Sequence, residues 1–169
     1  MNASAVKMDL GPLLKLQDTL KAGERMRVKV GLLAPKASRF DIFKSTRTED
    51  KLNNPSLGLI HEKGDPESNI PPRSFLRMPL ETKLILKINQ IGKAVWRALL
   101  LRAGLETALE ELGVTAQNTV QEAFETGGWG QWAPLKPRTI ARKGSSAILI
   151  DSGQLRRAVS HEVVGGAAP

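Results

Sequence analysis

Apolar residues near the start of the chain recur with helical spacing, and the pattern then changes to strict alternation. The stretch 9–23 has Pro12 in its first turn and Gly23 at its end, which are ordinary start and stop signals of a helix. From Arg25 onward Met and Val alternate with Arg and Lys. This period of two predicts a half-buried strand over 25–34 with a basic outer face.

Two long amphipathic stretches make up a helical segment over 79–126. The first has an apolar stripe of Leu80, Leu84, Ile88, Ile91, Val95 and Leu99. The second, from 103 to 126, contains five glutamates and neither Lys nor Arg. The pattern fits one bent helix or two, with candidate kinks at Gly92, Gly104 and Gly113. Segments of opposite charge can pack as a hairpin or line up between subunits.

The remaining segments are shorter. Ser56 can cap a helix that ends at Gly64, and either Asp151 or Ser152 can cap one helical turn. Residues 35–54 predict a projecting loop, or else the tip of an extended hairpin. Residues 132–164 predict a turn, short helices and a closing strand. We therefore expect one domain over 1–169 of class α+β, in which a small antiparallel sheet packs against long amphipathic helices.

Composition limits the classes of protein. The 169 residues are 41% hydrophobic but only 4% aromatic, so we expect a core of Leu, Ile, Val and Ala and no broad platform for stacking bases. The absence of cysteine excludes disulfides, zinc–thiolate sites and thiol catalysis. Neither a secretory signal at Met1–Gly11 nor an apolar run of about 20 residues is present, which predicts a soluble protein without membrane contact.

The net charge of +8 is concentrated in two stretches. Residues 25–51 hold eight Lys or Arg against three acids, and residues 136–157 hold six against one. Such basic stretches can meet DNA, an acidic partner subunit or only water.

Motifs for catalysis are missing. His61-Glu62 resembles the start of a zinc-protease helix, but position 65 is Asp rather than the second His. The chain has neither a nucleophile elbow nor a phosphate-binding loop. We therefore expect no enzyme, no metal and no cofactor.

Two signature segments carry a resemblance to a known family. The first, residues 57–77, runs Leu-Gly-Leu-Ile-His-Glu-Lys-Gly and then Ile-Pro-Pro-Arg-Ser-Phe-Leu-Arg; the second, residues 132–156, contains Trp-Ala-Pro-Leu and Leu-Ile-Asp-Ser-Gly-Gln-Leu-Arg. Together they resemble the tail-completion, or virion-morphogenesis, proteins of long-tailed bacteriophages. Two departures are Lys63, where the family commonly has an aromatic residue, and Ser152 for Thr. Some relatives carry the two signatures in the opposite order.

The resemblance implies a structural protein. Such proteins are α+β domains that assemble as rings, six-fold or a multiple, at the neck where head meets tail. It implies as partners the chain itself, other neck, head-completion and tail-tube proteins, and non-specific contact with packaged DNA. It implies a place in the virion at the head–tail junction, and in the host cytoplasm during assembly. The alternatives are a nucleic-acid-binding protein and a non-virion assembly factor.

The signature residues should mark fold and assembly surface rather than an active site: His61, Gly64, Ile70, Pro71, Arg73, Phe75, Leu76, Trp132, Pro134, Leu135, Thr139, Lys143, Asp151, Gly153 and Leu155. We expect Phe75 and Trp132 to anchor the core, with an exposed contact as the alternative for Trp132, and Arg73 can bridge to a neighbouring subunit's carboxylate. Candidate subunit or DNA-channel contacts are Arg39, Phe40, Phe43, Lys44, Arg47, Arg142, Arg156 and Arg157.

Overall fold

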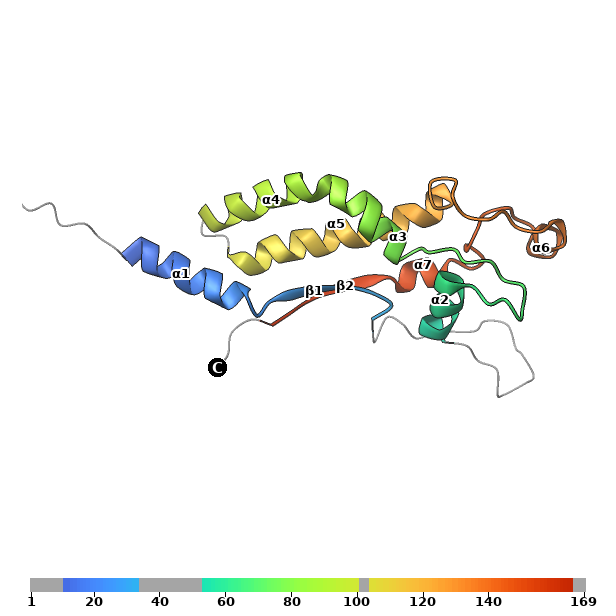
Figure 1. Ribbon diagram of the computed structural model, residues 1–169, viewed down its shortest axis with the longest axis horizontal. Helices are drawn as coiled ribbons and strands as arrows, with labels where there is room; N and C mark the ends of the chain where they lie inside the picture. The colour runs from blue at the N-terminus through green and yellow to red at the C-terminus, as the bar shows by residue number, and fades with distance from the viewer. Residues whose placement is uncertain (1–10, 34–52, 101–103, 166–169) are drawn as a thin grey trace, which may run out of the picture.

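A two-stranded antiparallel sheet packs against one long helix in the computed structural model, which describes residues 11–33, 53–100 and 104–165 (Figure 1). The predicted α+β class is confirmed. The elements in chain order are α1 (Gly11–Gly23), β1 (Arg27–Gly31), α2 (Asn54–Lys63), α3 (Arg77–Pro79), a π-helical turn (Leu80–Leu84), α4 (Ile85–Leu100), α5 (Leu105–Thr126), α6 (Pro137–Lys143), α7 (Gln154–Ala158) and β2 (Ser160–Val164).

The sheet joins the first strand of the fold to the last. Val28 lies opposite Val163, and Val30 lies opposite His161. Directly opposed residues share one face of an antiparallel sheet, so these four side chains form the face that packs on α5. On the other face Lys29 pairs with Glu162, Nζ to Oε1 3.2 Å. The predicted alternation is confirmed, over a strand shorter than the predicted 25–34.

Helix α5 packs closely on the sheet at Gly113. The imidazole of His161 lies over this glycine, with Nδ1 2.7 Å from Gln117 Oε1 and Nε2 2.8 Å from Glu110 Oε1. A Cβ atom at Gly113 would be 2.3 Å from His161 Cδ2. Gly113, a predicted kink, therefore lies inside the uninterrupted α5 and allows close packing on the sheet.

The helical segment 79–126 is two helices that pack as a hairpin. Gly104, with φ 87°, precedes the first residue of α5, and α4 packs beside α5. Of the two arrangements that the sequence left open, the hairpin within the chain is the one observed.

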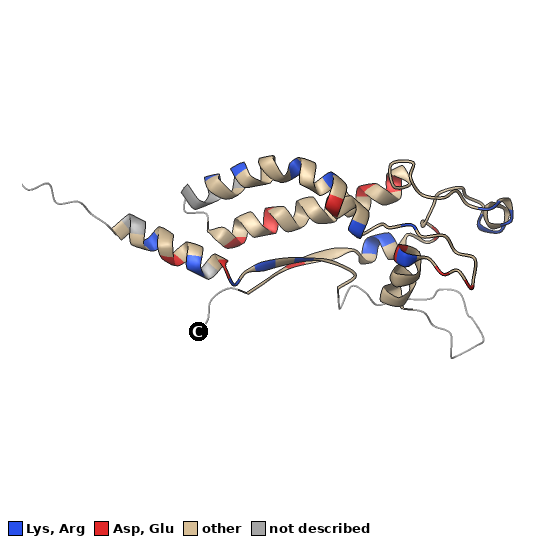
Figure 2. Cartoon of the chain, in the orientation of Figure 1, with Lys and Arg blue, Asp and Glu red and all other residues tan. Residues whose placement is uncertain are grey.

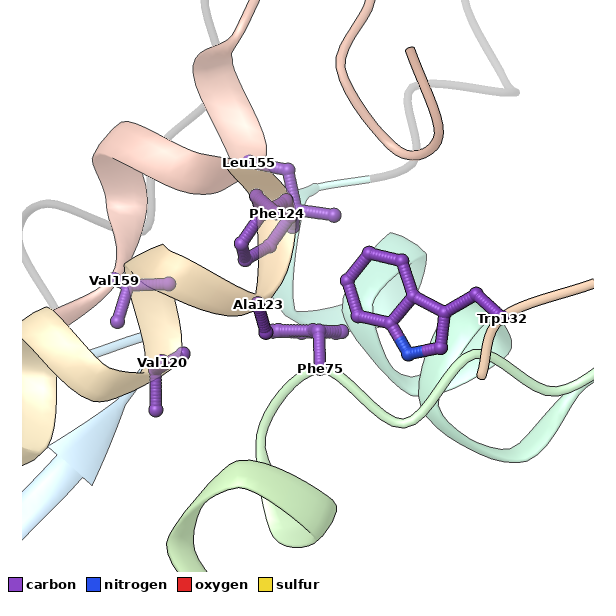
Figure 3. Packing of buried hydrophobic residues seen from close by; sticks show 7 residues of the cluster. All are labelled: Phe75, Val120, Ala123, Phe124, Trp132, Leu155 and Val159. Carbon is purple, nitrogen blue, oxygen red and sulfur yellow. The ribbon is translucent and has the colours of Figure 1, made fainter. Parts of the chain in front are cut away.

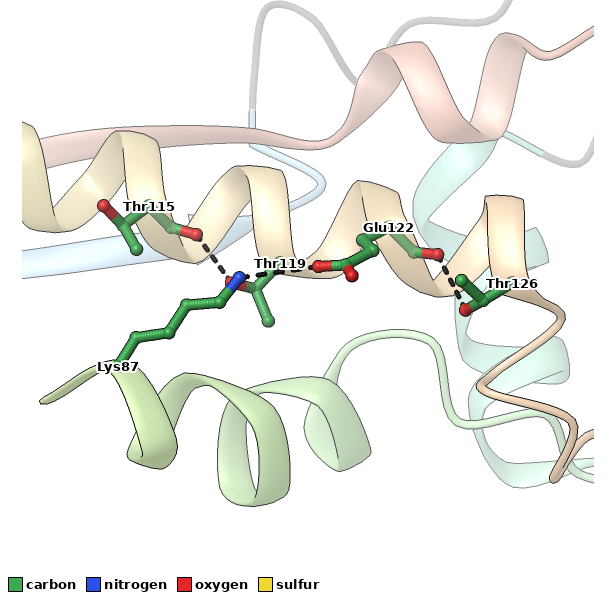
Figure 4. Close-up of polar contacts among 5 residues, drawn as sticks. All are labelled: Lys87, Thr115, Thr119, Glu122 and Thr126. Atoms are coloured by element: carbon green, nitrogen blue, oxygen red, sulfur yellow. Dashed lines mark hydrogen bonds and ion pairs between the residues drawn. The ribbon is translucent and has the colours of Figure 1, made fainter.

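Most of the predicted apolar stripe lies at half-buried positions: Leu80, Leu84, Ile91 and Val95. Lys87 also faces α5, where its Nζ lies 3.2 Å from Thr119 Oγ1 and 3.4 Å from Glu122 Oε2 (Figure 4). Ile88, a member of the predicted stripe, is 55% exposed, so the stripe is wrong at this position.

Aromatic side chains occupy the centre of the core, contrary to the expectation from composition. The Phe75 and Phe124 ring centroids are 5.2 Å apart, and Trp132 meets Phe124 edge-on at 5.9 Å (Figure 3). A few aromatic rings can thus form the centre of a core when they cluster, because each ring buries a large apolar area. The remaining members of the buried cluster are Val120, Ala123, Leu155 and Val159.

Two predicted helix caps are wrong, although the helices are present. Asn53 caps α2, because its Oδ1 accepts a hydrogen bond from Ser56 N at 2.9 Å, whereas Ser56 was the predicted cap. The predicted end of α2 at Gly64 is confirmed. Helix α7 starts after Gly153, with φ 74° and no side-chain cap, rather than at Asp151 or Ser152.

Helices α1 and α6 lie at opposite ends of the molecule (Figure 1). Helix α1, predicted as 9–23, leaves Leu14, Leu16 and Leu20 exposed. Its last residue, Gly23, lies against the side chain of Leu105 at the start of α5. Most of the predicted loop, residues 35–52, lies outside the described residues.

Candidate functional site

The carboxylate of Glu62 organises the chain between α2 and α3. Its Oε2 accepts hydrogen bonds from the main-chain N–H groups of Phe75 and Leu76, both at 2.9 Å. Its Oε1 accepts from Arg77 N at 3.1 Å and from Ser74 Oγ at 2.5 Å. One side chain thus satisfies N–H groups at the start of a helix from outside that helix.

Arg73 joins the two signature segments. Its Nε donates to Ala133 O at 3.0 Å, and its Nη2 lies 3.4 Å from Pro134 O. Arg73 is 6% exposed, and burial lowers the pKa of its guanidinium. The expected bridge to a neighbouring subunit's carboxylate is therefore wrong, because the guanidinium is buried and binds carbonyl oxygens of its own chain.

Trp132, in the second signature segment, adds a further bond to the first segment. Its Nε1 donates to Ser74 O at 3.2 Å, while its ring packs on Phe124. A Cβ atom at Gly128 would lie 2.4 Å from Trp132 Nε1, so the preceding turn has room only for glycine there. The expected roles of Trp132 and Phe75 as core anchors are confirmed: they are 6% and 1% exposed.

The turn between the halves of the first signature segment depends on Gly64. Its φ is 79°, and a Cβ atom there would lie 2.9 Å from Ile70 O and 2.8 Å from Pro72 N. Asp65 and Ile70 then pair through two main-chain hydrogen bonds of 2.9 and 2.8 Å. This turn brings the chain back, so that Arg73 N donates to the carbonyl of His61 at 2.7 Å.

The ring of His61 is half-buried. Its pKa lies below the ordinary value, because burial disfavours the imidazolium and the charge of Arg73 adds to the effect. Its Nδ1 is buried and has no hydrogen-bond partner among the described residues. Among all the residues that the structure describes, no three His, Asp or Glu side chains lie close enough together to hold a metal ion.

The second signature segment continues through α6 to α7. Lys143 Nζ donates to Ala147 O, and its pKa is lowered by burial, against which Asp151 acts to raise it and Arg73 to lower it further. Leu155 is buried, and Asp151 is exposed. Half-buried positions in the two segments are Ile70, Pro71, Leu76, Leu135 and Thr139, whereas Pro134 is exposed. Most of the signature residues are thus buried or half-buried, and they stabilise the contact between the two signature segments.

The basic residues that the structure describes are spread along the length of the molecule (Figure 2). Arg142 on α6 is exposed, Arg156 pairs with Glu125, and Arg157 Nη2 donates to Ser152 O at 2.9 Å. The α6 cations lie at one end of the molecule, far from those of β1. The candidate contacts Arg39, Phe40, Phe43, Lys44 and Arg47 lie outside the described residues.

Hollows in the described surface include one beside α7 and one along α5. One, of 400 Å³, is lined by residues 150–153 with Gln121, Arg156 and Arg157. The other, of 810 Å³, lies along the first half of α5 and is lined by Gly104, Glu106, Thr107, Glu110, Glu111, Val114 and Thr115. Neither hollow brings a nucleophile and a base together with a third orienting group.

Sequence reasoning missed Glu62 and Ser74, the residues that hold the junction from within the first signature segment. The motif His61-Glu62 drew attention only as a failed metal site. A sequence pattern for capping relies on short spacing, whereas Glu62 binds N–H groups 13 to 15 residues later. Among the described residues, no helix is long and apolar enough to cross a membrane.

Comparisons with known proteins leave the chain without a family assignment. No protein-family model matches it. Neither a curated protein nor a solved structure matches it significantly.

Proposed function

We propose that this chain is a structural virion protein of a tailed bacteriophage that acts in tail completion and head–tail joining as a ring component of the neck. The observation that carries the proposal is the junction of the two signature segments, at which Arg73 binds the carbonyls of Ala133 and Pro134. The residues on which the family resemblance rests are therefore mostly framework. A protein whose recognisable residues build a rigid body suits a mechanical role better than a catalytic one.

The arrangement of the elements also favours assembly. A subunit of a ring needs a stiff body with surfaces on different sides, so that each copy meets two neighbours. Here the sheet, α5 and the aromatic core form the body, while α1 and α6 lie at its two ends (Figure 1). Charges of opposite sign, acidic on α5 and basic on α4, can complement each other between copies.

The proposed partners are further copies of the chain, other neck proteins, head-completion proteins and tail-tube proteins. Contact with packaged DNA would be to phosphates and without sequence preference. The proposed location is the head–tail junction of the virion, after assembly in the host cytoplasm.

The direct test is to image the head–tail junction of purified phage particles at a resolution that traces the chain. We expect a ring of this fold at the neck, with the Glu62 and Arg73 junction recognisable inside each subunit. Particles that contain the chain elsewhere, or lack it, would overturn the proposal. If particles lack the chain but cannot assemble without it, the result would favour a non-virion assembly factor.

A second candidate function is nucleic-acid binding, favoured by the cations at the α6 end. Lys136, Arg138 and Arg142 are all exposed there. The test is DNA binding by the purified protein at a series of salt concentrations. A binder would lose affinity steeply, with a logarithmic slope of about −0.9 for each phosphate neutralised. For a neck protein outside its ring we expect weak binding, and K136E/R138E measures the contribution of α6.

A further inference from the structure

The outer side of α4 carries large apolar side chains in contact with water. Those of Ile85, Leu86, Ile88 and Trp96 are between 55% and 74% exposed, and we name them the α4 ridge. Single exposed apolar residues are ordinary, but several on one helix mark an interaction surface. The bonds of Lys87 to Thr119 and Glu122 on the opposite side of the helix fix this orientation.

Two exposed cations, Lys93 and Arg97, belong to the same helix as the α4 ridge. No ion pair among the described residues involves either of them. A partner for the α4 ridge should therefore offer apolar surface together with negative charge.

The groove along the first half of α5 has these properties. Glu106, Glu110 and Glu111 supply the negative charge, and Val114, 44% exposed, supplies an apolar surface. The exposed leucines of α1 lie towards the same end, since Gly23 abuts Leu105. The stretch 103–126 contains no cation that could neutralise the glutamates from within the helix.

The α4 ridge cannot reach the groove of its own chain. Trp96 follows Lys87 by nine residues, which places it about 180° around the helix axis from the side that contacts α5. Lys87 is fixed on that side by Thr119 and Glu122. By the same rule Ile85 also lies opposite Lys87, whereas Leu86 and Ile88 lie on the two flanks of the helix, so the α5 groove of the same chain does not cover the α4 ridge.

We infer that the α4 ridge of one copy docks on the acidic α5 groove of a second copy. The charges are complementary, and the same pairing of a basic α4 with an acidic α5 already occurs within the chain between Lys87 and Glu122. The two surfaces differ, so the contact is heterologous and repeats from copy to copy, closing into a ring or growing as an open chain. The inference deepens the self-assembly part of the proposed function and rests on it.

The test measures self-association of the full chain by sedimentation velocity, after nuclease treatment, over a range of protein and salt concentrations. We expect concentration-dependent association that weakens with salt. K93E/R97E should raise the apparent dissociation constant by about tenfold or more, and E106K/E111K should do the same from the other surface. The matched control, K136E/R138E on α6, should associate like the original chain.

Mixing the two charge-reversed proteins gives the sharpest result. Each alone sets like charges against like, whereas the mixture offers opposite charges at every contact, so association should return. Circular dichroism checks that each variant is folded. Should one charge-reversed variant fail to fold, W96A tests the same contact through its apolar part and should also weaken association.

Three results would overturn the inference: a chain that stays monomeric, association unchanged in both charge-reversed variants, and a mixture that does not associate. These failures are separate from failure of the neck role. A ring seen at the neck with α4 away from the subunit contact would overturn the docking surface alone. Absence of the chain from particles, with association intact, would overturn the neck role alone.

Discussion

The guanidinium of Arg73 binds the main-chain oxygen of Ala133, 60 positions later in the chain, with Nε 3.0 Å from the carbonyl. This contact connects the segment before α3 with the segment after α5. A lysine at this position keeps the charge but loses the two-nitrogen fork. We expect R73K to lower the free energy of unfolding by about 1.5–3 kcal/mol, because the single ammonium group of lysine leaves at least one of the two carbonyls without its charged donor.

Urea denaturation followed by circular dichroism measures this difference. The matched control is R142K, because Arg142 is exposed on α6 and should tolerate the change within about 0.5 kcal/mol. Equal stability of R73K and R142K would show that the bonds to Ala133 and Pro134 do not stabilise the fold.

The carboxylate of Glu62 accepts hydrogen bonds from four donors. E62Q keeps one oxygen acceptor and replaces the other with an NH₂ group that faces donors. We expect a loss of about 1–3 kcal/mol in the free energy of unfolding, also measured in urea. E67Q, at an exposed glutamate, is the matched control and should leave stability unchanged. An E62Q protein as stable as E67Q would contradict the assigned role.

Glycine positions in α4 and α5 should respond oppositely to the same substitution. G92A adds a methyl group where nothing lies within 4 Å, so we expect it to stabilise the fold by about 0.5–1 kcal/mol through helix propensity. G113A would place its Cβ 2.3 Å from His161, and we expect a net loss of about 1–3 kcal/mol. Thermal unfolding of the two variants compares them directly; stabilisation by G113A would mean that α5 and β2 are not packed as described.

The lowered pKa of His61 predicts loss of stability in mild acid. The unfolded chain takes up a proton on this ring near its ordinary pKa of 6.5, whereas the folded chain does so only at lower pH. The contribution of His61 to the free energy of unfolding is therefore complete above pH 6.5 and falls as the pH drops below this value. It levels off below the pKa of His61 in the folded chain. H61Q should remove this part of the pH dependence. Urea midpoints from pH 8 to 4 test it, and parallel curves for the two proteins would contradict it.

The periodic elements were predictable from sequence because local pattern determines them. The alternation that includes Val28 and Val30 gave β1, and the apolar stripe of 103–126 gave α5. The prediction failed wherever a distant residue decides the structure. Lys87 faces α5 because Thr119 and Glu122 of that helix bind its ammonium group, and Ile88 beside it faces water. The junction at Arg73 was missed for the same reason, since its acceptors lie in another segment.

Pairing of β1 with β2 makes completion of this fold a late event during synthesis. Lys29 and its partner Glu162 are separated by 133 positions. At about 5–20 residues per second, the ribosome needs on the order of ten seconds to make the second strand after the first. For that time both edges of β1 lack their partner strand, and the charges of Arg27 and Lys29 on its outer face disfavour premature pairing with strands of other nascent chains.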